Sequence, residues 1–160
     1  MIQAITATNF TAYISTEDNR INTSVAKTQI RHLVKFTNDM DKSIQYAYST
    51  VHLIYDRYTK FVFDYNATPN VYTGKVDFLP SGFWKYEVYE ISWVGAVTIS
   101  LGNAPANEND VLSPPAATKG IVQGLVTKGK MYVADKAGTA QVQYTQRQEP
   151  SGTNYIYYGQ

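Results

Sequence analysis

Few residues of this sequence have the type and spacing that catalysis or metal binding requires. The two histidines, His32 and His52, lie in separate runs of apolar residues that are typical of strands, and they could meet across neighbouring strands. A zinc site would need a third or fourth ligand, and the sequence has no cysteine and no His-x-His spacing to supply one. We therefore expect both histidines to be hydrogen-bonded structural residues, and we expect no metal site and no cofactor.

Acidic side chains gather in two polar segments. Asp39 and Asp41 are the closest approach to a pair of catalytic carboxylates. An acid-base pair needs one desolvated and one solvated carboxyl group, and a polar loop gives no such contrast. Glu17, Asp18 and Asn19 begin like a calcium-binding loop, but the alternating oxygen ligands and the closing glutamate are missing. We expect solvated turns at both places.

Motifs of known enzyme classes are missing from the sequence as well. There is no Gly-x-Ser-x-Gly elbow, and Gly120, Gly124 and Gly129 are not followed by the Lys-Ser/Thr of a phosphate-binding loop. A catalytic function would need a nucleophile, a base and an orienting group that the sequence does not place together. We therefore expect a non-enzymatic protein without catalytic residues.

The composition favours contacts with other proteins over contacts with nucleic acid or membrane. Lys and Arg number 14 against 13 Asp and Glu, and the basic residues are scattered, so no specific nucleic-acid binding is expected. Charged residues make up 17% of the chain while tyrosines number 14, which suits protein contact surfaces. The first residues lack the pattern of a signal peptide, and no apolar run approaches about eighteen residues, so no membrane span is expected.

The stretch between Tyr58 and Trp93 determines the expected fold class. Three runs rich in aromatic and β-branched residues are separated by two clusters of turn residues, which predicts consecutive antiparallel strands. Together with further short runs they predict an all-β chain, an antiparallel β-sandwich with about ten short strands. The expected strands cover residues 2–8, 11–15, 26–36, 50–55, 58–65, 71–78, 83–93, 94–101, 121–126, 131–133, 140–145 and 154–158.

Alternation along these strands predicts which side chains face the core. In the strand over residues 58–65 the inward set is expected to be Thr59, Phe61, Phe63 and Tyr65. In the strand over residues 83–93 the inward set is Trp84, Tyr86 and Val88. A bulge before Ile91 would let Trp93 turn inward too. Residues 127–130 contain Gly129 and predict the turn of a hairpin between the runs at 121–126 and 131–133.

The length of 160 residues predicts one domain with three appended features. Residues 1–10 can form a first strand or an arm that joins another sheet. Residues 102–119 form a long loop rich in Pro and Asn, which is either an arm that packs on a neighbour or a plain mobile loop. The Tyr-rich strand at 154–160 either closes the edge of a sheet or docks on a partner.

One local pattern carries a resemblance at the level of the fold. Residues 77–89 (Asp-Phe-Leu-Pro-Ser-Gly-Phe-Trp-Lys-Tyr-Glu-Val-Tyr) resemble the tyrosine corner of an immunoglobulin- or fibronectin-type sandwich, with Trp84 in the aromatic position. An indole N–H can donate the hydrogen bond that the corner normally obtains from a phenol. The resemblance implies an immunoglobulin-like sandwich.

A second resemblance extends from Tyr55 to the end of the chain. The segments at residues 55–60, 82–90 and 121–133 resemble small virion proteins of tailed bacteriophages, those of crAss-like phages in particular. Such proteins serve as head-to-tail connector, ring or decoration subunits. The resemblance implies a virion protein that is assembled in the host cytoplasm and that binds itself in a ring and binds portal, capsid or tail subunits.

Two alternatives to a connector or ring subunit stay open. One is a capsid decoration protein, and the other is a carbohydrate-binding module in which Trp93 and nearby tyrosines stack on sugar rings. For the assembly function, composition and chain position predict a set of contact residues. They are Ile2, Ile5, Pro105, Pro114, Pro115, Tyr155, Tyr157 and Tyr158.

Overall fold

The computed structural model describes residues 1–136, and this part of the chain is all-β. No helix within it exceeds three residues, and none could cross a membrane. The expected strands at 140–145 and 154–158 lie outside the described residues. The strands are β1 (Ile2–Ile5), β2 (Phe10–Ile14), β3 (Ile30–Asn38), β4 (Ile44–Tyr48), β5 (Val51–Ile54), β6 (Thr59–Tyr65), β7 (Lys75–Val76), β8 (Gly82–Ser92) and β9 (Ile121–Ala134). The 3-10 helices are η1 (Glu17–Asn19), η2 (Lys27–Gln29) and η3 (Val71–Thr73).

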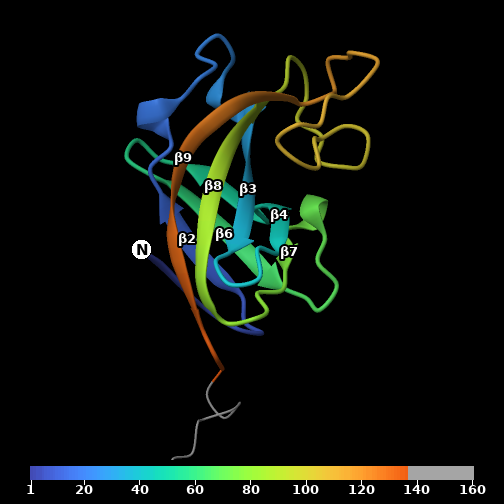
Figure 1. Ribbon diagram of the computed structural model, residues 1–160. Helices are drawn as coiled ribbons and strands as arrows, with labels where there is room; N and C mark the ends of the chain where they lie inside the picture. Colours follow the sequence, from blue (N-terminus) through green and yellow to red (C-terminus); the bar gives the residue numbers. More distant parts are fainter. Residues whose placement is uncertain (137–160) are drawn as a thin grey trace, which may run out of the picture.

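The strands form two sheets. Sheet A has the order β1-β9-β8-β3-β4, and sheet B has the order β2-β6-β5 with β7 added beside β6. Strand β1 runs parallel to β9 and β7 runs parallel to β6, while the other neighbours are antiparallel. Figure 1 shows β9, β8 and β3 side by side, with β2 and β6 crossing behind them. The N-terminal segment is therefore a strand of its own sheet.

The main core lies between the two sheets. Phe36 of sheet A packs edge-on against Phe63 of sheet B, with ring centroids 5.3 Å apart. Alternation along each strand supplies the rest of the core, because every second side chain points to the same face. The buried members are Ala4, Phe10, Ala12, Ile14, Val34, Phe36, Ala47, Phe61, Phe63, Val76, Phe78, Trp84, Val88, Met131 and Val133.

The expected faces of β6 and β8 are confirmed with one exception. In β6 the first three expected residues are buried, but Tyr65 is 37% exposed because it lies beyond Phe63, the last residue that pairs with β2. In β8 Trp84 and Val88 are buried and Tyr86 packs half-buried against the core. The register between β8 and β9 shifts at two points before Ile91, so the predicted bulge is confirmed.

The predicted hairpin at residues 121–133 is wrong, because β9 runs without a turn from Ile121 to Ala134. Gly129 pairs with Tyr86 in the middle of the β8–β9 ladder. A Cβ on Gly129 would lie 2.5 Å from the Tyr86 hydroxyl oxygen. The glycine is therefore explained by the close approach of an aromatic side chain rather than by a turn.

Three other expectations are corrected. Residues 94–101 form no strand, and the expected strand at 71–78 is divided between η3 and the two-residue β7. Strand β4 is not predicted from the sequence, because the polar residues just before it are typical of a loop. In the turn between β3 and β4, Asn38 Oδ1 accepts a hydrogen bond from the Met40 N–H, and Asp41 Oδ1 accepts one from the Ser43 N–H. These side chains turn the chain within a few residues, so a strand can follow directly.

Candidate functional site

The two histidines meet between the sheets. His32 Nδ1 of β3 and His52 Nε2 of β5 are 2.8 Å apart, and Phe61 packs edge-on against both rings. They therefore pair across the two sheets and not along one sheet. Burial, the neighbouring His52 and Arg31 lower the pKa of His32, while burial and Arg31 lower the pKa of His52 to about 3. Among residues 1–136 no third metal-ligating side chain joins them.

The acidic residues have structural partners. Asp39 forms an ion pair with Lys85 at 3.1 Å, and Glu17 forms one with Lys27 at 2.8 Å. The hydrogen bond from the Ser43 N–H lowers the pKa of Asp41. The two aspartates thus take part in structural contacts at the turn between β3 and β4.

The long connection between β8 and β9, residues 93–120, folds back over the outer face of sheet A. It covers the half of that face where Leu33 and Tyr48 lie, and it forms a second core with them. The Tyr48 hydroxyl donates a hydrogen bond to the Pro105 carbonyl oxygen at 2.8 Å, and Trp93 Nε1 donates one to the Thr118 carbonyl oxygen at 3.1 Å. We call this region the covered half of sheet A.

A charged side chain fixes the connection to the sheet. Glu108 accepts a hydrogen bond from Lys35 Nζ of β3 at 2.6 Å and one from the Tyr46 hydroxyl of β4 at 2.6 Å. Burial favours a higher pKa for Glu108, but the hydrogen bonds from Lys35 and Tyr46 outweigh it and lower the pKa. The carboxylate stays ionised and holds the connection in place.

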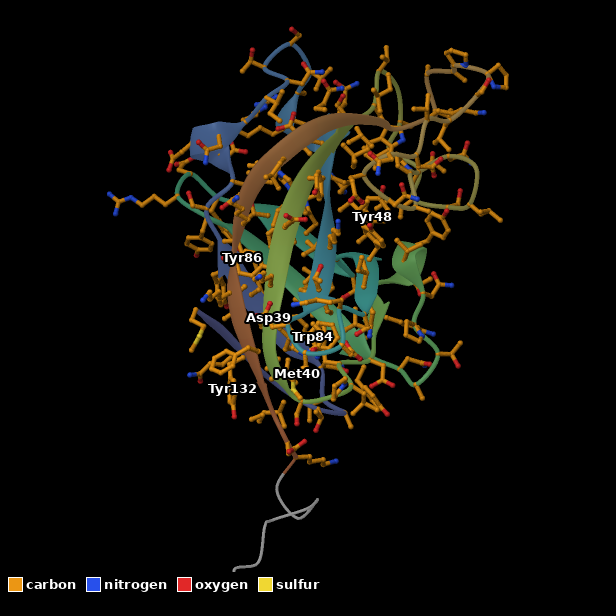
Figure 2. The ribbon with its side chains drawn as sticks, in the orientation of Figure 1. Asp39, Met40, Tyr48, Trp84, Tyr86 and Tyr132 are labelled. Atoms are coloured by element: carbon orange, nitrogen blue, oxygen red, sulfur yellow. The ribbon has the colours of Figure 1, made fainter. Side chains whose placement is uncertain are left out.

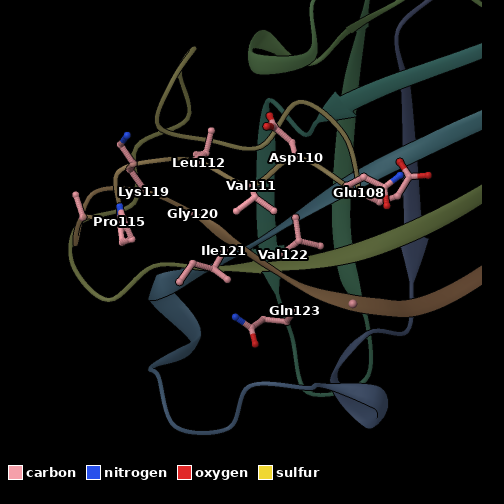
Figure 3. Close-up of a pocket in the computed structure, with 13 residues that line it drawn as sticks. Glu108, Asp110, Val111, Leu112, Pro115, Lys119, Gly120, Ile121, Val122 and Gln123 are labelled. Carbon is pink, nitrogen blue, oxygen red and sulfur yellow. The ribbon is translucent and has the colours of Figure 1, made fainter.

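A hollow lies where the connection joins β9, with a volume of about 610 Å³ (Figure 3). Val111 projects toward it from the connection, and Ile121 and Val122 border it from β9. Polar groups in its lining have hydrogen-bond partners: Lys119 Nζ donates to the Ser113 carbonyl oxygen, and Gln123 Nε2 donates to Ser92 Oγ. We call this hollow the loop-end pocket. Its lining is mainly apolar, and Val111 at its rim is 87% exposed.

The outer face of sheet B is open and aromatic. Tyr13 of β2 packs edge-on against Tyr58 at 5.4 Å, and Tyr55 lies 4.9 Å from Tyr58 across the β5–β6 hairpin. Val51 and Leu53 continue the face along β5. Between 39% and 60% of each of these five side chains is exposed. We call these residues the tyrosine face.

The predicted contact residues are distributed over several places. Ile2 is half-buried against the main core, Ile5 is 47% exposed at the end of β1, and Pro105 is buried under its own connection. Pro114 is exposed, and Pro115 is exposed at the loop-end pocket. Tyr155, Tyr157 and Tyr158 lie outside the described residues.

The tyrosine face was missed at the level of sequence. Its signal was available, because Tyr13 alternates with buried Ala12 and Ile14, and Tyr55 and Tyr58 flank a turn. Trp93, one of the side chains expected to stack on sugar rings in a carbohydrate-binding module, is fully buried and offers no ring to a sugar.

Comparison of this chain with family models, with curated proteins and with solved structures finds no match. A functional proposal is therefore based on the surfaces described above and on the two sequence resemblances.

Proposed function

We propose that this chain is a non-enzymatic virion structural protein of a tailed phage, most simply a head-to-tail connector or ring subunit that forms a homo-oligomer. In the particle it would contact portal, capsid or tail subunits. The phage assignment is supported by the sequence resemblance of residues 55–60, 82–90 and 121–133. In the structure these residues form the turn between β5 and β6, the start of β6, and most of β8 and β9.

The assembly part of the proposal depends on one observation: among the described residues, an apolar face that projects and an apolar pocket lie at different places on the domain. The tyrosine face projects outward at the β5–β6 hairpin, whereas the loop-end pocket is concave. In Figure 1 the hairpin (teal) lies on the left and the connection (yellow to orange) lies on the right. A closed ring requires two different complementary surfaces on each subunit, because each copy contacts the next in the same sense.

We infer that Tyr55 and Tyr58 of one copy enter the loop-end pocket of the next. A pocket of about 610 Å³ lies within the range that holds a ligand of several rings, so it has room for two tyrosine side chains. Aromatic side chains are the residues that most often dominate such contacts. Arg57 and Asp56 at the hairpin tip would stay at the polar rim.

A rigid sandwich suits this role. The order β9-β8-β3-β4 facing β2-β6-β5 follows the strand order of an immunoglobulin variable-type domain, in which G-F-C-C′ faces B-E-D. The hydrogen bond from Trp84 at the start of β8 is placed like that of a tyrosine corner. These two features support an immunoglobulin-like type for the two packed sheets.

The test is the mass of the purified chain in solution, measured by native mass spectrometry and light scattering. The wild-type chain should form a discrete oligomer, and Y55S/Y58S and V111D should each abolish it. Tyr65→Ser is the matched control, because Tyr65 is similarly exposed at the opposite end of β6 and outside the tyrosine face. Oligomers that survive both variants would overturn the proposed contact.

A further inference from the structure

The half of the outer face of sheet A that the connection leaves open carries an aromatic patch. Phe83 of β8 lies opposite Tyr132 of β9, with ring centroids 5.1 Å apart. Met40 lies in the β3–β4 turn, near Gly82 at the start of β8, and Ile5 pairs with Ala134 at the end of β9. The exposed fractions of Phe83, Tyr132, Met40 and Ile5 are 53%, 38%, 75% and 47%. Figure 2 shows Met40 and Tyr132 in the lower half of the molecule, well away from Tyr48 in the covered half.

The chemistry of this aromatic patch favours an aromatic occupant. The rings of Phe83 and Tyr132 can take up a third ring in an edge-to-face contact, and the Met40 sulfur also prefers aromatic partners. Lys85 and Lys130 pair in register beside the two rings. Among residues 1–136 Lys130 has no ion-pair partner, so its ammonium group is free to lie over an aromatic face.

An aromatic segment of the same chain begins within reach of the patch. Residues 154–160 (Asn-Tyr-Ile-Tyr-Tyr-Gly-Gln) contain three tyrosines and no charged side chain. The described chain ends at Lys136, four residues after Tyr132, where the Lys136 N–H donates a hydrogen bond to Thr6 Oγ1 at 2.9 Å. The intervening residues 137–153 can extend over at most about 60 Å, which is more than the four residues from Lys136 back to Tyr132 require.

We propose that residues 154–160 dock on the aromatic patch of their own molecule. Docking within one molecule is favoured because the short linker keeps the segment at a high effective concentration. The outer face of sheet A would then be covered by its own chain on both halves. The tyrosine face and the loop-end pocket would stay open to neighbouring copies, so this contact does not depend on the proposed ring.

The oxidation rate of Met40 tests the docking directly. Met40 and Met1 are similarly exposed in the described structure, at 75% and 77%, whereas Met131 is fully buried. With dilute hydrogen peroxide and peptide mass spectrometry of the full chain, we expect Met40 to oxidise several-fold more slowly than Met1. The triple variant Y155S/Y157S/Y158S should remove that protection, as should Phe83→Ser.

Two controls show whether the docking segment of the same molecule protects Met40. Tyr144→Ser changes a tyrosine outside the docking segment and should leave Met40 protected. Protection should also be unchanged on tenfold dilution, because the contact lies within one molecule. Equal oxidation of Met40 and Met1 in the wild-type chain, or protection that disappears on dilution, would overturn the proposal, whatever the oligomeric state.

Discussion

The indole Nε1 of Trp84 donates a hydrogen bond to the carbonyl oxygen of Pro80, 3.1 Å away. Trp84 is fully buried, and its ring packs edge-on against Phe78 at 5.2 Å. The hydrogen bond therefore joins the start of β8 to the preceding loop from inside the core. Asn38 Nδ2 donates to the same carbonyl oxygen at 3.2 Å, so β3 is joined to the loop at this point as well.

We expect Trp84→Phe to lower the free energy of unfolding by about 2 kcal/mol, through loss of one buried hydrogen bond and formation of a small cavity. The change should be measured by urea unfolding. Phe83→Tyr alters the adjacent exposed residue and serves as the control, with little expected change. A Trp84→Phe protein as stable as the wild type would show that the hydrogen bond has no structural importance.

Gly129 should tolerate no side chain. A Cβ there would overlap the ring of Tyr86, so Gly129→Ala should destabilise the fold by about 1–3 kcal/mol. Tyr86→Leu should reduce that penalty in the double variant, because the overlapping ring is removed. Urea unfolding of the four proteins gives the coupling energy directly. Additive effects of the two substitutions would contradict a steric role for the Tyr86 ring at this glycine.

The pair of His32 and His52 should make stability fall in acid. Both pKa values are lowered in the folded chain, that of His52 to about 3, so folding favours the neutral rings. Below the ordinary histidine pKa of about 6.5 the unfolded chain binds protons that the folded chain does not, and the free energy of unfolding decreases. For His52 the loss between about pH 6.5 and pH 5 should be about 2 kcal/mol.

The measurement is urea unfolding at about pH 7.5 and about pH 5 for the wild type and for His52→Gln. Gln keeps a hydrogen-bonding side chain but does not titrate, so the stability of the variant should depend less on pH. The difference between the two proteins isolates the histidine from the carboxylates that also titrate in acid. Equal pH dependence of both proteins would contradict the assignment of a neutral pair.

The sequence predicts local patterns of this fold better than the contacts that bring distant segments together. Alternation placed Phe61, Phe63, Trp84 and Val88 in the core, because side-chain direction in a strand has a period of two. Gly129 misled the prediction of a turn, since the reason for this glycine is the ring of Tyr86 on another strand. The neighbours of Gly129 in the sequence do not show whether this glycine forms a turn or leaves room for an aromatic ring.

The candidate surfaces were less predictable than the core. The tyrosine face joins Tyr13 to Tyr58, which are 45 positions apart in the sequence and meet because β2 pairs with β6. Likewise, the connection packs on its own sheet because Glu108 reaches Lys35 and Tyr46, a contact that no local pattern encodes. Composition indicated a contact-rich protein, but the register between strands decides which side chains stand together.

The central claim, a head-to-tail contact between the tyrosine face and the loop-end pocket, is tested most directly by mixing two defective copies. Y55S/Y58S lacks the projecting tyrosines but keeps the pocket, and V111D keeps the tyrosines but lacks the pocket. Each should be monomeric alone. Native mass spectrometry of an equal mixture should show a one-to-one dimer and no larger species, because one intact contact joins the two copies and then no further contact can form. A mixture that stays monomeric beside an oligomeric wild type, or variants that assemble alone, would contradict the account.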